Sequence, residues 1–211
     1  MKNGTTWRTA CIVAALAFGL AAAASAEVGM GLSTGGWFTP DFEPAKGFFD
    51  WWTLRMEAEI SPFAALEARA SGFWTSGDWK EESAERGWRG DDFELMILAL
   101  EIGPILKLSL DPLSFYGGGG IGAYLSSGSL DVWAGDRKHN VDLDFGSEIG
   151  AYAVGGIQFF LTDTVAIFGE VRYTWLDAEM DTEWWNGGKF LDGKRVSFDG
   201  FGSNLGVMVW F

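Results

Sequence analysis

The feature that most constrains the fold is an alternation of apolar and polar residues with a period of two. It runs through eight segments, at residues 28–37, 51–60, 63–74, 92–110, 113–127, 145–161, 164–176 and 196–211. Successive side chains of a β-strand point to opposite faces, so this period is that of a strand and not of a helix. The pattern predicts an all-β chain of eight strands.

Charged residues of both signs recur in the middle of these segments. In residues 51–60, Leu54 and Met56 lie on one face, and Arg55 and Glu57 lie on the other. A sandwich would expose the polar face to water, whereas a membrane barrel would turn the apolar face to lipid and the charges inward. For a barrel, we predict that the inward charged residues are Arg55, Glu57, Glu59, Glu67, Arg69, Glu101, Lys107, Glu148, Glu170 and Arg172.

Aromatic residues favour the membrane barrel. They fall at both ends of the apolar faces and bracket an aliphatic band, which is the arrangement that membrane–water interfaces select. Residues 52–60, 165–175 and 201–211 also have the length of a tilted transmembrane strand. The predicted girdle residues are Trp37, Trp52, Trp74, Phe115, Phe159, Tyr173, Trp175, Phe201 and Phe211.

The connections alternate in length along the chain. Ser61-Pro62, Asp111-Pro112 and Thr162-Asp163 are predicted tight turns, and residues 38–50, 75–91, 128–144 and 177–195 are predicted long polar loops. Short periplasmic turns and long extracellular loops are typical of outer-membrane barrels. The pattern therefore predicts an eight-stranded antiparallel up-and-down barrel with both chain ends on the short-turn side.

The segment 92–110 is over-long and could also be read as a membrane helix. Glu101, Pro104 and Lys107 argue against a lipid-exposed helix, so we interpret it as a strand with Met96 outward. Pro104 cannot donate a ladder hydrogen bond, which predicts a bulge or irregular pairing near Gly103-Pro104. Phe93 lies out of phase with the outward face.

Residues 1–26 read as a signal peptide. Lys2 and Arg8 precede an apolar stretch at 11–24, and Ala24 to Ala26 fit a cleavage site. Cleavage removes Cys11 and leaves 27–211 as one barrel domain with 13 basic residues (15 less Lys2 and Arg8) against 29 acidic ones. Such an acidic domain is not expected to bind nucleic acid.

Several stretches support a family resemblance: "YGGGGIGAY" (116–124), "AVGGIQFFLTD" (153–163), "EVRYTW" (170–175) and "LGVMVWF" (205–211). Together with the eight amphipathic segments, they resemble the eight-stranded outer-membrane β-barrel domain family of the OmpA/OmpX type. The resemblance implies a location in the bacterial outer membrane, with its lipid and lipopolysaccharide as partners. It also implies an assembly signal read by the barrel-assembly machinery, at Leu205, Val207, Val209 and Phe211; family members often have an aromatic residue where this chain has Val209.

Two functions fit such a barrel. In the leading one, salt bridges plug the lumen and the protein is structural and surface-exposed, with long loops available to an extracellular ligand. In the alternative, the lumen is a narrow channel for ions or small molecules, because six inward acids face four inward bases. The loop residues proposed for contact with a ligand are Trp79, Trp88, Trp133, Trp184 and Trp185.

Enzymatic chemistry is not expected. His139 is the one histidine, and only a hydrolase with a nearby serine at 126, 127 or 129 would use it. The glycines at 117–120 lack the Lys-Ser/Thr of a phosphate-binding loop. We predict no catalytic residue, no metal site and no cofactor.

Overall fold

The computed structural model describes residues 27–42, 47–78, 82–83, 88–134, 136–182 and 194–211. The signal peptide predicted at residues 1–26 lies outside these ranges. Within them, no helix has the length and apolar character needed to cross a membrane.

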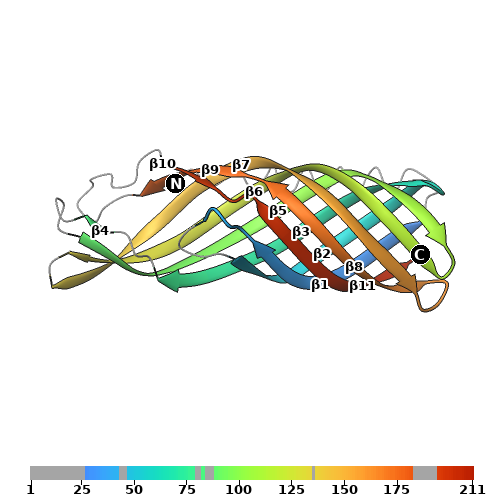
Figure 1. The fold of residues 1–211 in the computed structure, drawn as a ribbon, viewed down its shortest axis with the longest axis horizontal. Helices are drawn as coiled ribbons and strands as arrows, with labels where there is room; N and C mark the ends of the chain where they lie inside the picture. Colours follow the sequence, from blue (N-terminus) through green and yellow to red (C-terminus); the bar gives the residue numbers. More distant parts are fainter. Residues whose placement is uncertain (1–26, 43–46, 79–81, 84–87, 135, 183–193) are drawn as a thin grey trace.

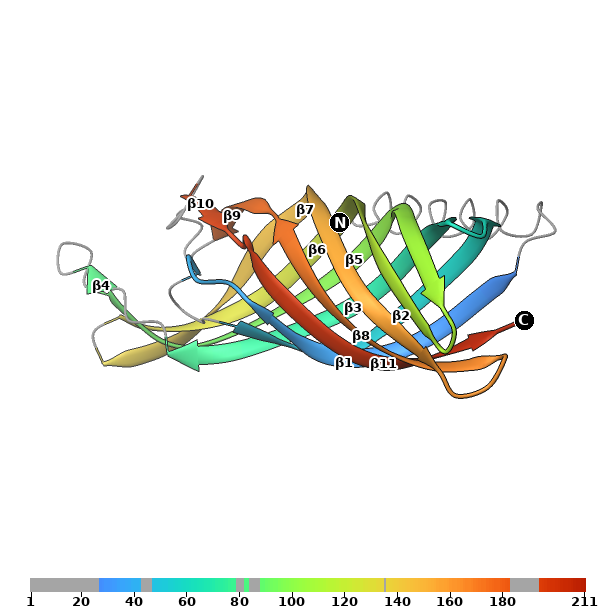
Figure 2. The same cartoon turned by 45° about the vertical axis from the view of Figure 1, so that its right-hand side comes forward.

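Eight strands form a closed antiparallel ring (Figures 1 and 2). Each pairs with its neighbour along the chain, and β1 pairs with β11 while β7 pairs with β8, so the ring has no free edge between its first and last strands. This confirms the predicted all-β up-and-down barrel. The ring strands are β1 Val28–Phe38, β2 Gly47–Ser61, β3 Ala64–Asp78, β5 Trp88–Leu110, β6 Leu113–Ala134, β7 Arg137–Phe160, β8 Val165–Trp175 and β11 Gly200–Trp210.

Three short strands lengthen the wall at the long-loop end. β4 (Glu82–Ser83) pairs with β5, and β9 (Asp177–Thr182) pairs with β7 and with β10 (Lys194–Ser197). β9 follows β8 after one residue, Leu176, and the Leu176 amide donates to the Asp199 carboxylate at 2.7 Å. The β9–β10 pair therefore continues the β8–β11 pair beyond a local break.

The two ends of the barrel domain meet at the short-turn end (Figure 2). The Val28 amide donates to the Phe211 carbonyl at 3.3 Å, and the Phe211 amide donates to the Val28 carbonyl at 2.9 Å. The even strand count thus closes the barrel with Phe211 held by backbone hydrogen bonds.

The predicted loops at 75–91 and 128–144 are mostly strand, which corrects the sequence-based boundaries. β5, β6 and β7 contain 23, 22 and 24 residues, roughly twice the 9–11 that a tilted strand needs to cross the hydrocarbon core. The sequence-based prediction of a loop at residues 128–144 rests on their many acidic side chains. Val132, Val141 and Leu143 are buried at alternate positions within this stretch, so the period of two in fact continues.

Of the bulge or irregular pairing predicted near Gly103-Pro104, the irregular pairing is present and the bulge is not. The β5–β6 register is the same before and after these two residues, from Ile102↔Ile121 to Ile105↔Gly118, and the β3–β5 ladder continues through them. Only the β5–β6 pairing is interrupted. A Cβ atom on Gly103 would lie 2.2 Å from the Gly119 carbonyl oxygen, so glycines let the two backbones approach closely where Pro104 cannot donate.

The outer wall is apolar, and eight of the nine predicted girdle residues face outward or are partly exposed. Trp37 is the exception: it is 1% exposed and lies inside the barrel. The outward positions of β1 are Met30, Leu32 and Phe38, so the predicted phase of Trp37 is wrong and Phe38 occupies the outer face instead.

Candidate functional site

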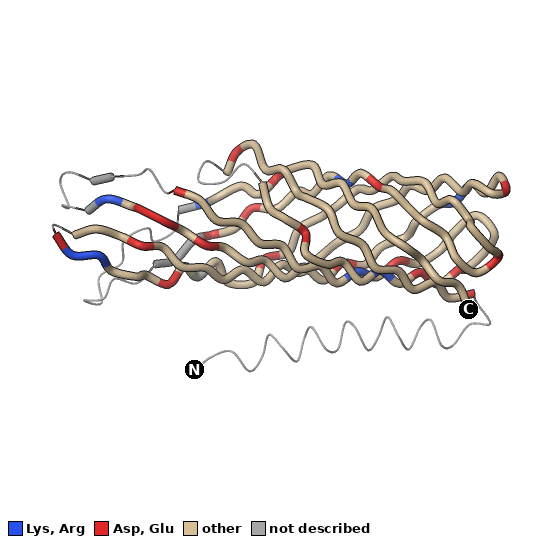
Figure 3. The backbone as a smooth tube through the Cα atoms, turned by 90° about the horizontal axis from the view of Figure 1, so that it is seen from below, with Lys and Arg blue, Asp and Glu red and all other residues tan. Residues whose placement is uncertain are grey.

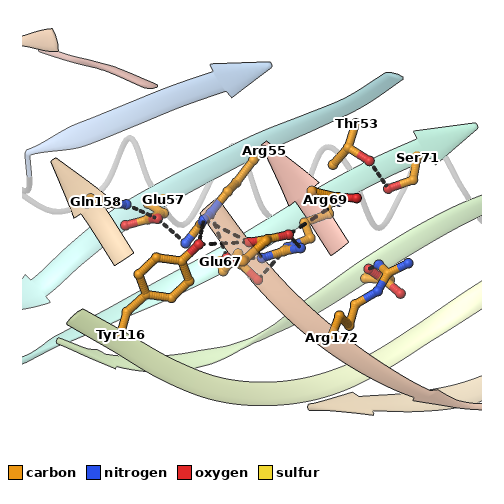
Figure 4. Close-up of polar contacts among 12 residues, drawn as sticks. Thr53, Arg55, Glu57, Glu67, Arg69, Ser71, Tyr116, Gln158 and Arg172 are labelled. Atoms are coloured by element: carbon orange, nitrogen blue, oxygen red, sulfur yellow. Dashed lines mark hydrogen bonds and ion pairs between the residues drawn. The ribbon is translucent and has the colours of Figure 1, made fainter. Parts of the chain in front are cut away.

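Four charged side chains from three strands form the centre of the lumen, and Figure 4 labels three of them, Arg55, Glu67 and Arg69. Arg69 holds Glu67 through two contacts, Nε to Oε1 at 2.7 Å and Nη2 to Oε2 at 2.9 Å, and also contacts both carboxylate oxygens of Glu170. Arg55 forms ion pairs with Glu67 at 2.8 Å and with Glu170 at 3.1 Å. Residues 101 positions apart in the chain are thus joined across the barrel interior.

Hydroxyl and amide groups complete the coordination of this central network. The Tyr116 hydroxyl donates to Glu170 at 2.8 Å and accepts from Arg55 at 2.6 Å. Asn204 donates to Glu170 at 3.4 Å, and Tyr152 donates to Glu67 at 3.4 Å. Because most of these groups are buried, the hydrogen bonds offset the desolvation that a buried charge would otherwise suffer.

Two further groups of charges flank the centre. Toward the short-turn end, Lys107 pairs with Glu57 at 3.3 Å and with Glu59 at 2.7 Å, and its ammonium lies 4.1 Å from the Trp210 ring centroid. Arg55 also pairs with Glu57 and so connects this group to the centre.

On the other side, Arg172 pairs with Glu101, which also accepts from the Tyr124 hydroxyl at 2.6 Å. Nine of the ten predicted inward charges therefore meet in ion pairs inside the barrel.

Glu148 is the tenth, and it does not join them. It lies opposite Tyr124 in the β6–β7 ladder, so it shares the inward phase, but it is only partly buried. None of the ion pairs among the described residues includes it.

An apolar core fills the lumen toward the long-loop end, and sequence reasoning missed it. Trp37, Phe42, Phe48, Phe93 and Phe198 belong to one buried cluster, with ring centroids 4.9 Å apart for the Phe42–Phe198 pair. Phe93 is thus not in an anomalous phase: it faces inward with Leu95 and Ile97. The run of apolar residues at these inward positions of β5 was the available signal.

An eight-stranded barrel has an interior just wide enough to be filled by side chains. Here the filling has two parts, the ionic network in the middle and the apolar core at the long-loop end. Both parts consist of buried side chains in direct contact. The arrangement places buried side chains along two successive stretches of the barrel axis.

A cluster of charged residues lies at the long-loop end of the barrel (Figure 3). Lys138 contacts Asp91 at 2.8 Å and Asp131 at 3.1 Å, and the Trp133 indole donates to Asp91 at 3.1 Å. The hydrogen bond from Lys138 lowers the pKa of Asp91, and the one from Asn140 lowers the pKa of Asp131, with Lys138 adding to it. The hydrogen bonds from Lys138 to Asp91 and Asp131 raise the pKa of Lys138.

A recess of about 570 Å³ lies beside this cluster, lined by Asp78, Asp92, Glu94, Asp131, Ser129 and Asn140 among others. The predicted loop residues Trp88 and Trp133 lie on strands β5 and β6, which corrects their assignment to loops. Trp133 is partly buried. Trp79, Trp184 and Trp185 lie outside the described residues.

His139 and Ser129 have opposite phases in the β6–β7 ladder. His139 lies on β7 opposite Val132, whose side chain is buried on the inner face, whereas Ser129 is paired with Asp142 on the other face. Ser126 is six positions along β6 from Val132, roughly 20 Å of strand.

The fold is that of a small membrane barrel, and sequence comparison identifies the family. Residues 9–208 match the family described as the outer membrane protein beta-barrel domain. The chain belongs to this family, and its location is the bacterial outer membrane. No curated protein has a sequence that matches the chain.

Solved structures with similar folds are also outer-membrane barrels. A major outer membrane protein of Thermus thermophilus has 14% identity and a TM-score of 0.54, with 89% of this chain and 100% of that chain covered. Ail, the attachment invasion locus protein of Yersinia pestis, has 14% identity and a TM-score of 0.49 over 88% and 97% of the two chains. Neisserial surface protein A has 15% identity and a TM-score of 0.45 over 89% and 98%.

Proposed function

We propose that this protein is a closed, surface-exposed barrel that displays an extracellular sheet, and not a channel. The observation that carries the proposal is the double filling of the lumen. The ionic network around Arg69 and Glu170 is followed by the apolar core around Phe42 and Phe198. An ion crossing the barrel would have to displace both.

The excess of inward acids is the feature that favours the alternative, a narrow cation path. Those acids are largely neutralised by contacts inside the barrel: Glu57, Glu67 and Glu170 each contact two cations. Opening a path would separate buried ion pairs, which costs several kcal/mol for each charge left without a partner. The apolar core contributes no charge that could replace the water around a passing ion.

The displayed element is the extension of β5, β6 and β7. Each strand has roughly 12 residues more than membrane crossing requires, which is about 40 Å of strand at 3.3 Å per residue. These strands place Lys138, Asp91 and Trp133 at fixed positions on a sheet. A rigid polar face is suited to an extracellular ligand, and the lipid and lipopolysaccharide around the barrel are its other expected partners.

The last strand supports the proposed assembly signal. Leu205, Val207 and Phe211 are exposed on the outer wall, and Val209 lies between them in the same phase. An apolar stripe that ends at a terminal aromatic residue is accessible to the barrel-assembly machinery before β1 and β11 close the ring.

Conductance in planar lipid bilayers tests the closed lumen. We expect no stable steps from the purified protein after refolding, and a folded sample is recognised by its different gel mobility before and after boiling. Stable, ion-selective steps would overturn the proposal and establish the channel.

Shortening the hairpin formed by the ends of β6 and β7 tests the display role. A variant lacking residues 131–140 should keep heat-modifiable mobility and lose contact with any surface ligand. Unchanged binding of such a ligand would place the contact elsewhere.

A further inference from the structure

Asp50 is a buried acid that the ionic network does not use. It lies on β2 opposite Gly35 of β1 and Phe73 of β3, and its exposed fraction is 0%. Its Oδ2 atom bonds the Thr53 hydroxyl at 2.7 Å, whereas its Oδ1 atom has no hydrogen-bond partner. No cation of the described residues is within ion-pair distance of it.

Among the described residues, Asp50 is the one fully buried acid that has no cation in direct contact. The buried acids are Asp50, Glu57, Glu67, Glu101 and Glu170, and the buried bases are Arg55, Arg69, Lys107 and Arg172. Each of the four glutamates has at least one cation in direct contact. A carboxylate at Asp50 would therefore be a buried charge without a counter-ion, which proteins avoid by neutralising the group.

The groups that face Asp50 come from three neighbouring strands and from across the lumen. Thr53 and the Trp52 amide on β2 are hydrogen-bonding neighbours, and Arg172 and Glu170 on β8 are the charges that act on it. Arg172 is already held by Glu101, and its guanidinium carbon lies 5.3 Å from the Phe73 ring centroid. Phe73 of β3 and Gly35 of β1 supply no charge.

The hydrogen-bond chain is compatible with a neutral acid. The Thr53 hydroxyl lies 2.7 Å from both Asp50 Oδ2 and Ser71 Oγ, and Figure 4 shows the Thr53–Ser71 contact. A hydroxyl carries one hydrogen, so Thr53 can donate to only one of these two atoms. A proton on Oδ2 would donate to Thr53, which would then donate to Ser71. Oδ1 would become a carbonyl oxygen, for which a missing donor matters less than for a charged oxygen.

We propose that Asp50 is a proton-binding site inside the barrel and is held as a neutral carboxylic acid at neutral pH. The inference rests on the closed lumen proposed above, because water at Asp50 would stabilise the carboxylate. A bound metal cation fits less well, since the Thr53 hydroxyl beside Asp50 is already engaged in hydrogen bonds with Asp50 and Ser71. Loss of the proton would set Asp50 and Glu101 in competition for Arg172.

Infrared spectroscopy of the refolded full-length barrel domain tests the proposal. The C=O stretch of a protonated carboxyl group should be present at neutral pH and shift on exchange into D₂O. It should be absent from Asp50→Asn and present in Glu101→Gln, the matched control with a paired carboxylate. Absence of the band from the wild-type protein, or its survival in Asp50→Asn, would overturn the proposal.

Stability provides a second measurement that does not depend on the band. If Asp50 is neutral, Asp50→Asn should fold with heat-modifiable mobility and resist urea as the wild-type protein does at neutral pH. Marked destabilisation by this change, or wild-type stability that requires sodium or potassium, would show that Asp50 is ionised. A conducting barrel that retains the band would refute the closed lumen and leave the proton site standing.

Discussion

Replacing Glu170 by Gln should strongly destabilise the barrel. Glu170 is 6% exposed and contacts Arg55, Arg69, Tyr116 and Asn204. The change leaves Arg69 with Glu67 as its remaining ion-pair partner, so the buried guanidinium of Arg69 loses one of its two carboxylates. Removing one partner of a buried pair costs about 3–5 kcal/mol. At about 1.4 kcal/mol per factor of ten, this raises the unfolding equilibrium constant roughly 100-fold or more.

Urea unfolding in lipid vesicles measures the effect, with gel mobility and tryptophan fluorescence as independent probes of the folded fraction. Glu59→Gln is the matched control, because the Glu59 side chain is 27% exposed and contacts only Lys107 in this network. Its loss should cost about 1 kcal/mol or less, since Lys107 retains Glu57.

The outcome separates two views of the lumen. If only its total charge mattered, removing one acid from an interior with an excess of acids would be neutral or stabilising. If individual ion pairs determine stability, Glu170→Gln is destabilising even though it reduces the excess of acids over bases in the lumen. Wild-type stability of Glu170→Gln would show that the local ion pairs do not determine the stability of the barrel. Adding Arg69→Met to Glu170→Gln should recover part of the loss, with a coupling energy of about 0.5–3 kcal/mol.

Three further changes test other parts of the barrel. Phe198→Ala should lower the free energy of unfolding in urea by about 3–5 kcal/mol, because it removes a ring from the centre of the apolar core. Phe201 is 63% exposed on the outer wall, so Phe201→Ala should cost much less. Equal effects would contradict the placement of these two residues on opposite faces. Deleting Phe211 should impair insertion into the outer membrane of cells more than the stability of the refolded barrel, and normal assembly without it would refute its role as a signal. The pKa of Asp91 lies below its ordinary value of 3.8, so the contact of Asp91 with Lys138 stabilises the long-loop end above pH 3.8. This stabilisation is lost as the pH falls through the lowered pKa of Asp91. Amide exchange at the ends of β6 and β7 should therefore accelerate on acidification in the wild-type protein and much less in Lys138→Met, and an identical response in both would count against the cluster.

The strand pattern could be predicted because alternation is local. Arg55 and Glu57 share a face of β2 whatever the rest of the chain does, and the prolines at 62 and 112 mark the turns that follow β2 and β5. The prediction of strand ends and outward residues was wrong where polar or aromatic residues interrupt the visible alternation. Val132 and Val141 continue the alternation between acidic residues, and Trp37 has an aromatic neighbour, Phe38, that takes the outward position.

The sequence by itself therefore determined the number of strands in the ring, the closure into a membrane barrel and most of the side chains that point inward. Only the tertiary structure decided which of them meet. Arg69 and Glu170 lie on β3 and β8, which are not paired to each other, and the common register of the closed ring brings them to one level. The same register gathers Trp37, Phe42 and Phe198 into the apolar core. Alternation determines whether a residue of a strand points inward or outward. The level along the barrel axis at which inward side chains of different strands come together depends on the stagger of all eight strands.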